Sequence, residues 1–160
     1  MTVIYICRHA DPDRSVAIDY QRWPGPMLTP KGVYEAKMLG RVLSYLGVGG
    51  RGNGALIFSP MQRTTDTALF AVNAYPEDSC KPFLFCDHAL TESQVGESTD
   101  SIRKRMLLAF QSACQWADQH PGSRTAIVTH GGPITVLLMA LGMPDADLVR
   151  YMGQCDNGSP

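Results

Sequence analysis

The strongest constraint on the fold is an alternation of short apolar runs and helical stretches, which repeats four times along the chain. The apolar runs are rich in β-branched and aromatic residues, as is typical of buried strands; they cover residues 3–7, 55–58, 82–86 and 125–129. Helices are predicted after them, from Thr29-Pro30, over about 60–74, from Ser98 or Thr99, and over Ile134–Leu141. This order predicts a three-layer α/β/α sandwich with a largely parallel central sheet.

The helix expected from Pro30 has a clear start and an apolar repeat. Thr29 is a suitable N-cap, and proline is favoured at the first helical position. Apolar residues then recur at helical spacing and predict a buried face: Tyr34, Met38, Leu39, Val42, Leu43 and Leu46. By similar reasoning Ser59-Pro60 is expected to start the second helix, and a short helical piece is expected over about 144–152.

Composition limits the class of protein. With 160 residues, 44% of them hydrophobic, the chain is expected to form one domain over residues 1–160 with its own core. A net charge of −1 argues against a nucleic-acid binder, which would carry a basic surplus. Five cysteines without a CxxC pair favour a reducing, cytoplasmic compartment. Neither a signal peptide nor an apolar run near the ~18 residues of a membrane span is found, so no membrane partner is expected.

Polar residues follow each predicted strand at the point where it ends. Arg8 and His9 follow the first strand, Arg63 lies shortly after the second, Glu92 follows the third, and His130-Gly131-Gly132 follows the fourth. Because the carboxyl ends of parallel strands share one edge of a sheet, where ligands bind, we expect these side chains to meet.

This set of residues suits a phosphate ester. Arg8 and Arg63 can each offer paired N–H donors to phosphate oxygens, and the helix start at Gly131 offers backbone N–H groups to an anion. A neutral His9 or His130 can attack phosphorus, and Glu92 can protonate the leaving oxygen. The sequence shows no HxxxH, HxH or CxxC pattern that would point to zinc.

Neighbouring residues allow two rival phosphate chemistries and one role without catalysis. Cys7 could be a thiolate nucleophile with Arg14, but six residues separate them and the loop lacks glycine. Asp11 and Asp13 could bind magnesium, but Arg8, His9 and Ala10 lie between the strand and the first aspartate. The third alternative is a catalytically weak module that only binds a phosphorylated ligand or phosphoprotein.

Five segments occur in an order that resembles the histidine phosphatase superfamily, with the phosphoglycerate mutase-like fold. They are RHA at 8–10, LTPKG at 28–32, SPMQRTTDTA at 59–68, LTESQVGES at 90–98 and VTHGGPI at 128–134. The resemblance implies that His9 becomes phosphorylated, that Glu92 donates a proton, and that His130 hydrogen-bonds the phosphoryl group. It also implies that Arg8, Arg63 and the N–H of Gly131 bind phosphate, and that no metal or organic cofactor takes part.

The sequence departs from the family pattern at three places. Ala10 replaces the usual glycine after the histidine, and only glycine tolerates a positive φ freely. The asparagine that reaches the phosphate in many relatives is missing, so Arg14 or Ser15 is expected to take over that contact. The sequence stops at Pro160, where relatives continue into a further strand, so either the last strand of the family is missing or this sequence is a shortened form.

The resemblance favours hydrolysis over mutase activity, because the segment from Ala71 to Ala89 is short where mutases carry longer insertions. We therefore predict a metal-independent phosphatase of the histidine acid phosphatase type. Its substrate would be a small phosphomonoester, such as a sugar or ribazole phosphate, and its product inorganic phosphate. A phosphohistidine protein phosphatase and a phosphoglycerate mutase remain alternatives within the family.

Overall fold

The computed structural model describes residues 3–15, 19–50 and 53–144. It contains every strand and helix predicted within those ranges, with a short 3₁₀ helix added; the piece expected over about 144–152 lies outside them, apart from its first residue. In chain order the elements are β1 (Ile4–Arg8), α1 (Pro30–Tyr45), β2 (Ala55–Phe58), α2 (Gln62–Asn73), β3 (Phe83–Cys86), η1 (His88–Leu90), α3 (Thr99–Gln119), β4 (Thr125–Thr129) and α4 (Gly131–Ala140). No helix within the described ranges is long and apolar enough to cross a membrane.

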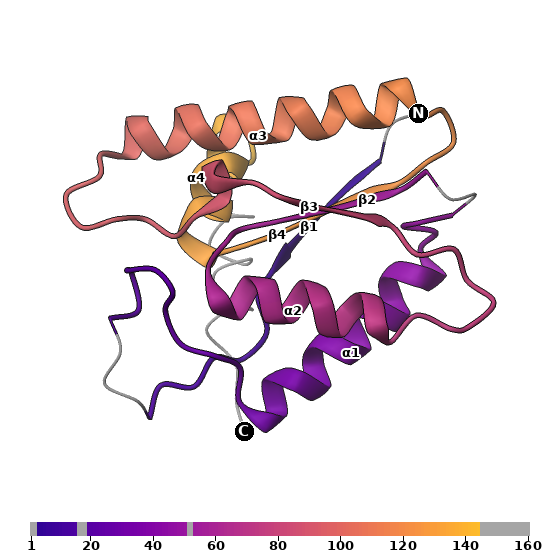
Figure 1. Cartoon of the computed structure of the whole chain (residues 1–160). Helices are drawn as coiled ribbons and strands as arrows, with labels where there is room; N and C mark the ends of the chain where they lie inside the picture. The colour runs from indigo at the N-terminus through magenta and orange to yellow at the C-terminus, as the bar shows by residue number, and fades with distance from the viewer. Residues whose placement is uncertain (1–2, 16–18, 51–52, 145–160) are drawn as a thin grey trace.

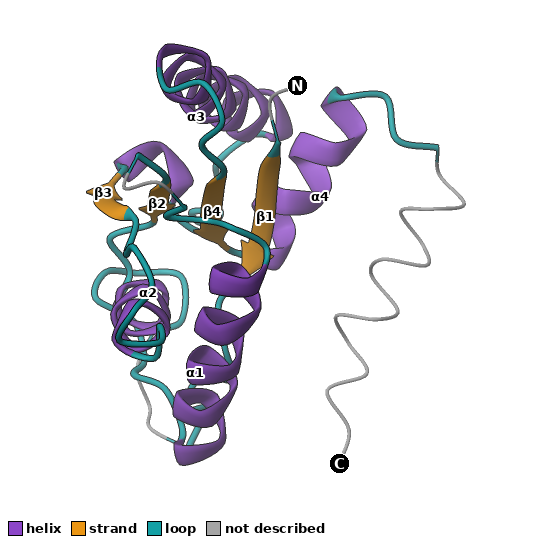
Figure 2. Ribbon diagram, turned by 90° about the vertical axis from the view of Figure 1, so that its right-hand side faces the viewer, coloured by secondary structure: helices purple, strands orange, loops and turns teal. Residues whose placement is uncertain are grey.

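The four strands form a parallel sheet in the order β1-β4-β2-β3. Thr125 of β4 pairs with Ile4 on one side and with Ala55 on the other, and Ala55 in turn pairs with Phe83. Helices α1 and α2 lie on one side of this sheet and α3 and α4 on the other (Figures 1 and 2). The predicted α/β/α sandwich with a parallel sheet is therefore confirmed.

The core is divided by the sheet into two layers. Side chains of the central strands alternate, so that Leu56 packs with Leu43 and Val72 from α1 and α2, while Ile57 packs with Met106 of α3 and Leu137 of α4. Strands β2 and β4 are buried along their whole length. This continuous burial explains why both strands appear in the sequence as uninterrupted apolar runs.

Helix α1 buries only part of the predicted face, with Leu43 in the core and Leu39 packed against it. The large side chains of Tyr34, Met38 and Val42 are exposed at 65%, 37% and 48% of their surface. A Cβ atom at Gly40 would collide with the backbone carbonyl of Ala71 in α2, so the two helices approach too closely for large side chains. The buried face consists instead of small residues and one leucine: Gly32, Ala36, Gly40 and Leu43.

Two of the predicted helix starts are confirmed and one is wrong. The Thr29 hydroxyl accepts a hydrogen bond from the backbone N–H of Gly32, and the Ser98 hydroxyl accepts one from Ser101. Helix α2 begins only at Gln62, with Met61 as its N-cap, so Ser59-Pro60 lies before the helix. The Ser59 hydroxyl is therefore free to make a different contact, described below.

Candidate active site

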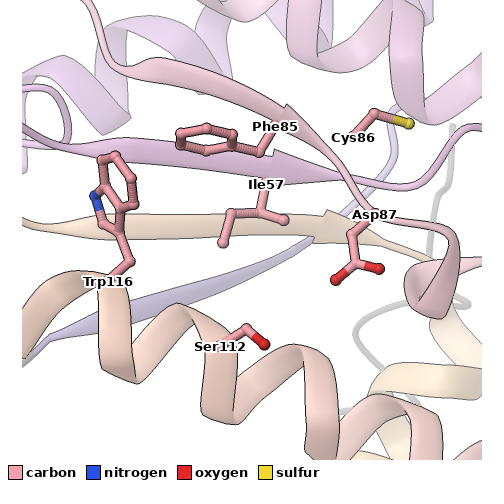
Figure 3. Close-up of a pocket in the computed structure, with 6 residues that line it drawn as sticks. All are labelled: Ile57, Phe85, Cys86, Asp87, Ser112 and Trp116. Atoms are coloured by element: carbon pink, nitrogen blue, oxygen red, sulfur yellow. The ribbon is translucent and has the colours of Figure 1, made fainter.

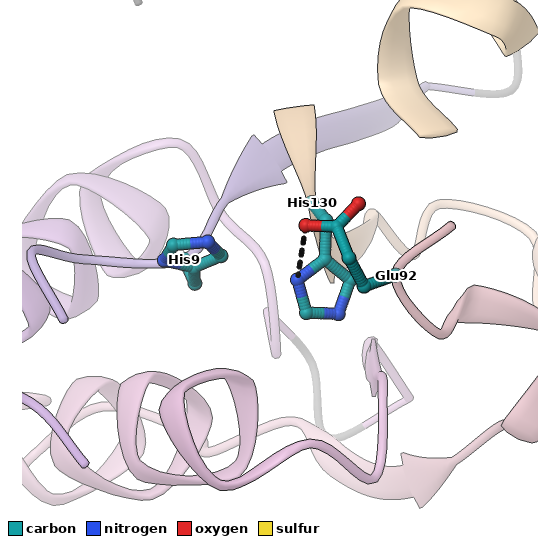
Figure 4. A group of neighbouring side chains, drawn as sticks. All are labelled: His9, Glu92 and His130. Carbon is teal, nitrogen blue, oxygen red and sulfur yellow. Dashed lines mark ion pairs between the residues drawn. The ribbon is translucent and has the colours of Figure 1, made fainter. Parts of the chain in front are cut away.

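The structure brings four of the predicted residues together at the carboxyl edge of the sheet. His9 follows β1, Arg63 lies in the first turn of α2, Glu92 follows η1, and His130 is the N-cap of α4. The ring centroids of His9 and His130 are 5.3 Å apart, and Arg63 Nη2 lies 3.3 Å from Glu92 Oε2. Figure 4 shows Glu92 beside the His130 ring, with His9 facing both from another segment.

His9 has the tautomer and charge of a nucleophile. Its Nδ1 lies 2.8 Å from the carbonyl oxygen of Ala10, which can only accept, so Nδ1 carries the proton and Nε2 keeps its lone pair. Burial, followed by the nearby guanidinium groups of Arg63 and Arg8, lowers the pKa of His9 to about 3. The imidazole is therefore neutral near pH 7.

Ala10 fits its position without backbone strain. Its N–H donates to the Thr67 hydroxyl at 3.0 Å, which anchors the turn after β1 to α2. None of the non-glycine residues that the structure describes has a positive φ, so Ala10 adopts a conformation that alanine ordinarily takes. Glycine is therefore not needed here for its conformational freedom.

His130 is fully buried and faces Glu92. Its Nε2 lies 2.9 Å from the hydroxyl of Ser59, which also accepts the N–H of Met61 and so can donate its own hydrogen to Nε2. This arrangement leaves the proton on Nδ1, 3.6 Å from Glu92 Oε2, the approach dashed in Figure 4. Burial is the main cause, and the charge of Arg63 the second, of a pKa of His130 well below its usual range. The imidazole is therefore neutral, and its contact with Glu92 does not join two opposite charges.

Arg63 is a fully buried cation with unused donors. Only Nη2 of its guanidinium meets a carboxylate, that of Glu92. Burial lowers the pKa of Arg63, although Glu92 opposes this, and an arginine remains charged over the working pH range. Within the described part of the chain three buried nitrogen atoms at this site have no hydrogen-bond partner, which we call the open donors: Nε and Nη1 of Arg63 and Nδ1 of His130.

Arg8 lies beside the start of α4. A Cβ atom built on Gly131 would be 3.6 Å from Arg8 Nε, and one built on Gly132 would be 3.6 Å from Glu92 Oε1. The start of α4 therefore has the Arg8 guanidinium near Gly131 and the Glu92 carboxylate near Gly132. Such a helix start favours an anion.

The structure does not bring Ser15 into this group of described residues. Ser15 is exposed, and its hydroxyl and N–H both donate to Asp13 Oδ1, at 2.6 and 2.9 Å. Arg14, the other residue expected near the phosphate, lies with its guanidinium carbon 5.6 Å from the ring centre of Tyr20.

The structure argues against both rival phosphate chemistries, the Cys7 thiolate and the magnesium site on Asp11 and Asp13. Burial raises the pKa of the Cys7 thiol to about 11, so the thiolate that a nucleophile requires is scarce at neutral pH. Asp11 Oδ2 accepts the Thr29 hydroxyl at 2.8 Å, and Asp13 accepts Ser15. Both carboxylates therefore hold the loop between β1 and α1 in shape.

The same cluster contains a set of atoms that could bind a metal ion. One ligand atom each from His9, Glu92 and His130 lie within 4.8 Å of one another, and two imidazoles with a carboxylate are common ligands of transition metals. Arg63 binds the carboxylate, however, and Arg63 and Arg8 both lower the pKa of His9. This positive field opposes a cation and favours an anion.

Sequence reasoning assigned no site role to three residues around this cluster: Tyr20, Ser59 and Arg105. Arg105 Nη1 donates to the carbonyl oxygens of Ala89 and Thr91, both at 2.7 Å. Its Nε and Nη2 bind both carboxylate oxygens of Glu97, at 2.7 and 3.0 Å, and this pairing is the main cause of the lowered pKa of Glu97. Arg105 thus holds the loop that carries Glu92.

A separate pocket of about 230 Å³ lies at the β3 edge of the sheet, between that strand and α3 (Figure 3). Its walls are mostly apolar; the lining residues are Ile57, Phe85, Cys86, Asp87, Ser112 and Trp116. The rings of Phe85 and Trp116 meet edge to face with centroids 4.7 Å apart. None of the predicted site residues lines this pocket.

The fold and the site define an α/β protein of the phosphoglycerate mutase-like class. The sequence matches the model of the histidine phosphatase superfamily (branch 1) over residues 4–78 and 71–159, and the chain belongs to this superfamily. A search of curated protein sequences gives no significant match.

Solved structures share the fold at low sequence identity. The chain superimposes on Bacillus stearothermophilus YhfR with a TM-score of 0.71 at 24% identity, covering 92% of this chain and 84% of that one. For a phosphoglycerate mutase from Bacillus anthracis the TM-score is 0.71 at 18% identity, with 88% and 80% covered. For a phosphoserine phosphatase from Entamoeba histolytica it is 0.63 at 18% identity, with 89% and 81% covered.

Proposed function

We propose that this protein is a phosphatase that hydrolyses small phosphomonoesters through a phosphohistidine on His9, with Glu92 as the proton donor. The observation that carries the proposal is the presence of the open donors of Arg63 and His130 beside the neutral His9. Buried N–H groups without a partner cost folding free energy, so their place beside a histidine lone pair is best explained by a ligand that accepts them. A phosphoryl group offers three such oxygens.

The proposed reaction has two displacements at phosphorus. In the first, the Nε2 lone pair of His9 attacks phosphorus, an N–P bond forms, the ester P–O bond breaks, and the acid form of Glu92 gives its proton to the leaving oxygen. In the second, water attacks phosphorus, its proton passes to the Glu92 carboxylate, and the N–P bond breaks to release inorganic phosphate. Arg8, Arg63 and the N–H groups at the start of α4 would stabilise the charge on the phosphoryl oxygens in both steps.

A trapping experiment tests this proposal directly. The full chain is incubated with an aryl phosphate in the presence of EDTA and quenched rapidly. We expect turnover to survive EDTA and the trapped phosphoryl group to be labile in acid and stable in alkali, as a phosphohistidine is. Absence of turnover with every phosphate ester tried would contradict the proposal and favour a module that only binds phosphorylated ligands.

The proton-donor role of Glu92 predicts a dependence on the leaving group. For Glu92→Gln we expect turnover of an alkyl phosphate, whose leaving oxygen needs a proton, to fall by about 10²–10³-fold. Turnover of 4-nitrophenyl phosphate, whose leaving group needs little protonation, should fall by less than about tenfold. Glu77→Gln, at an exposed position, is the matched control and should leave both rates unchanged. Equal losses for the two substrates would remove Glu92 from this role.

A further inference from the structure

Tyr20 lies inside the site rather than at its rim. Its hydroxyl is 3.3 Å from Nε2 of His9. Because Nδ1 of His9 already donates to Ala10, Nε2 can only accept, and the phenol is the donor in this contact. The lone pair that would attack phosphorus is therefore occupied by a hydroxyl of the same chain.

The ring of Tyr20 also covers the buried cation. The guanidinium carbon of Arg63 lies 4.1 Å from the ring centre, within the range of a cation–π contact. On the same loop, Gly25 approaches so closely that a Cβ atom there would be 2.7 Å from Arg63 Nη1. Arg63 has no exposed surface in this arrangement, so an anion could not reach it without displacing the tyrosine.

Among the described residues, neutral hydrogen bonds tie this part of the loop to the segments beside it. The Gln94 side-chain amide donates to the carbonyl of Gln21 at 2.9 Å, and the N–H of Gln62 donates to the carbonyl of Pro24 at 2.8 Å. Both are neutral hydrogen bonds, and the first is exposed. A phosphate dianion would replace the phenol contact with charge-assisted bonds, which are about twice as strong as neutral ones.

We propose that Tyr20 closes the anion site from within, so that its side chain and a phosphoryl group exclude each other at His9 and Arg63. The inference rests on the proposed function, because it assumes that phosphate binds between these two residues. Only the fraction of molecules with Tyr20 displaced can bind, and the apparent dissociation constant rises by the inverse of that fraction. Tyr20 thus lowers the affinity for free phosphate, which is the product of the proposed reaction.

The test measures inorganic phosphate binding to the full chain by calorimetry. For Tyr20→Ala, which loses both the hydroxyl and the ring, we expect about three- to thirtyfold tighter binding than for the unchanged protein. Tyr20→Phe keeps the ring over Arg63 and loses the hydroxyl, so it should show a smaller gain of about two- to tenfold. Tyr45→Ala, at a position of α1 that is 91% exposed, is the matched control and should bind phosphate as the unchanged protein does.

The outcomes separate this inference from the proposed function. Equal phosphate binding by the unchanged protein and Tyr20→Ala would overturn the closing role and leave the phosphatase proposal standing. Weaker binding by Tyr20→Ala would also overturn it, because Tyr20 would then contribute to the site instead of blocking it. Binding of phosphate by none of the variants would overturn both.

Discussion

Replacing His9 by alanine is expected to lower the turnover of phosphate esters by about 10⁴-fold or more and to abolish the trapped phosphoenzyme. The reason is that the proposed reaction has a single nucleophile, the Nε2 atom of His9, which carries no proton because Nδ1 donates to Ala10 and which can attack once the Tyr20 hydroxyl is displaced. His130 cannot take its place, because the Ser59 hydroxyl meets its Nε2 and the proton is left on its Nδ1. The measurement is single-turnover trapping with an aryl phosphate, followed by mapping of the labelled residue.

The control for His9 is a second histidine outside the site. His88→Ala changes an exposed residue of η1 and should keep both turnover and label. The thermal unfolding midpoint of His9→Ala is measured as well, because His9 is buried against the rings of Tyr20 and His130 and a loss of turnover must be separated from a loss of the fold. Label that persists in His9→Ala would remove it from the role of nucleophile.

Replacing Arg63 by methionine is expected to lower turnover by about 10³-fold while destabilising the protein less than Arg105→Met does. The guanidinium is fully buried and two of its nitrogen atoms are open donors. These open donors lower the stability of the fold, and under the proposed function they serve to bind the phosphoryl group. Removing one partner of a buried ion pair usually costs about 3–5 kcal/mol because the other charge is left unpaired, but in Arg63→Met the loss of the two open donors offsets part of that cost. Glu92 keeps the N–H of Ser93 and some solvent contact after the change.

Arg105 supplies the matched comparison for Arg63. Its guanidinium binds Glu97 and two backbone carbonyls, so Arg105→Met should destabilise the protein by about 3–5 kcal/mol. Both variants are compared by urea unfolding and by turnover of the same aryl phosphate. A loss of stability in Arg63→Met as large as that in Arg105→Met, or full turnover in Arg63→Met, would contradict the assignment of Arg63 to the anion.

The layout of the sheet could be predicted from the sequence because strand ends are local features. Each apolar run ends where its first polar residues begin, and a parallel sheet brings all such ends to one edge. That reasoning placed Arg8, His9, Glu92 and His130 on segments that do meet in the structure. The helix starts at Thr29 and Ser98 were equally local, since a cap depends on neighbouring residues alone.

Contacts that depend on which other segment of the same chain packs against a residue could not be predicted. The exposed Tyr34 and the buried Gly40 reverse the expectation from hydrophobicity, because the close approach of α2 excludes side chains whatever their polarity. Tyr20 lies in a long loop that has no periodicity to fix its path. The sequence alone would place Arg105 among the solvent-facing cations of α3. Its contacts with the loop that carries Glu92 become visible only in the structure.

The strand order has a consequence for how the chain becomes a functional protein during synthesis. Strand β1 pairs only with β4 within the described sheet, and β4 starts at Thr125, near the end of the described chain. The segment that carries His9 is made before β4, so β1 must wait for its β4 neighbour until that strand has left the ribosome. Long-range parallel pairing of this kind is intrinsically slow. His9 and His130 are therefore brought together only in the last stage of folding, and under the proposed function incomplete chains would be unable to form a phosphoenzyme.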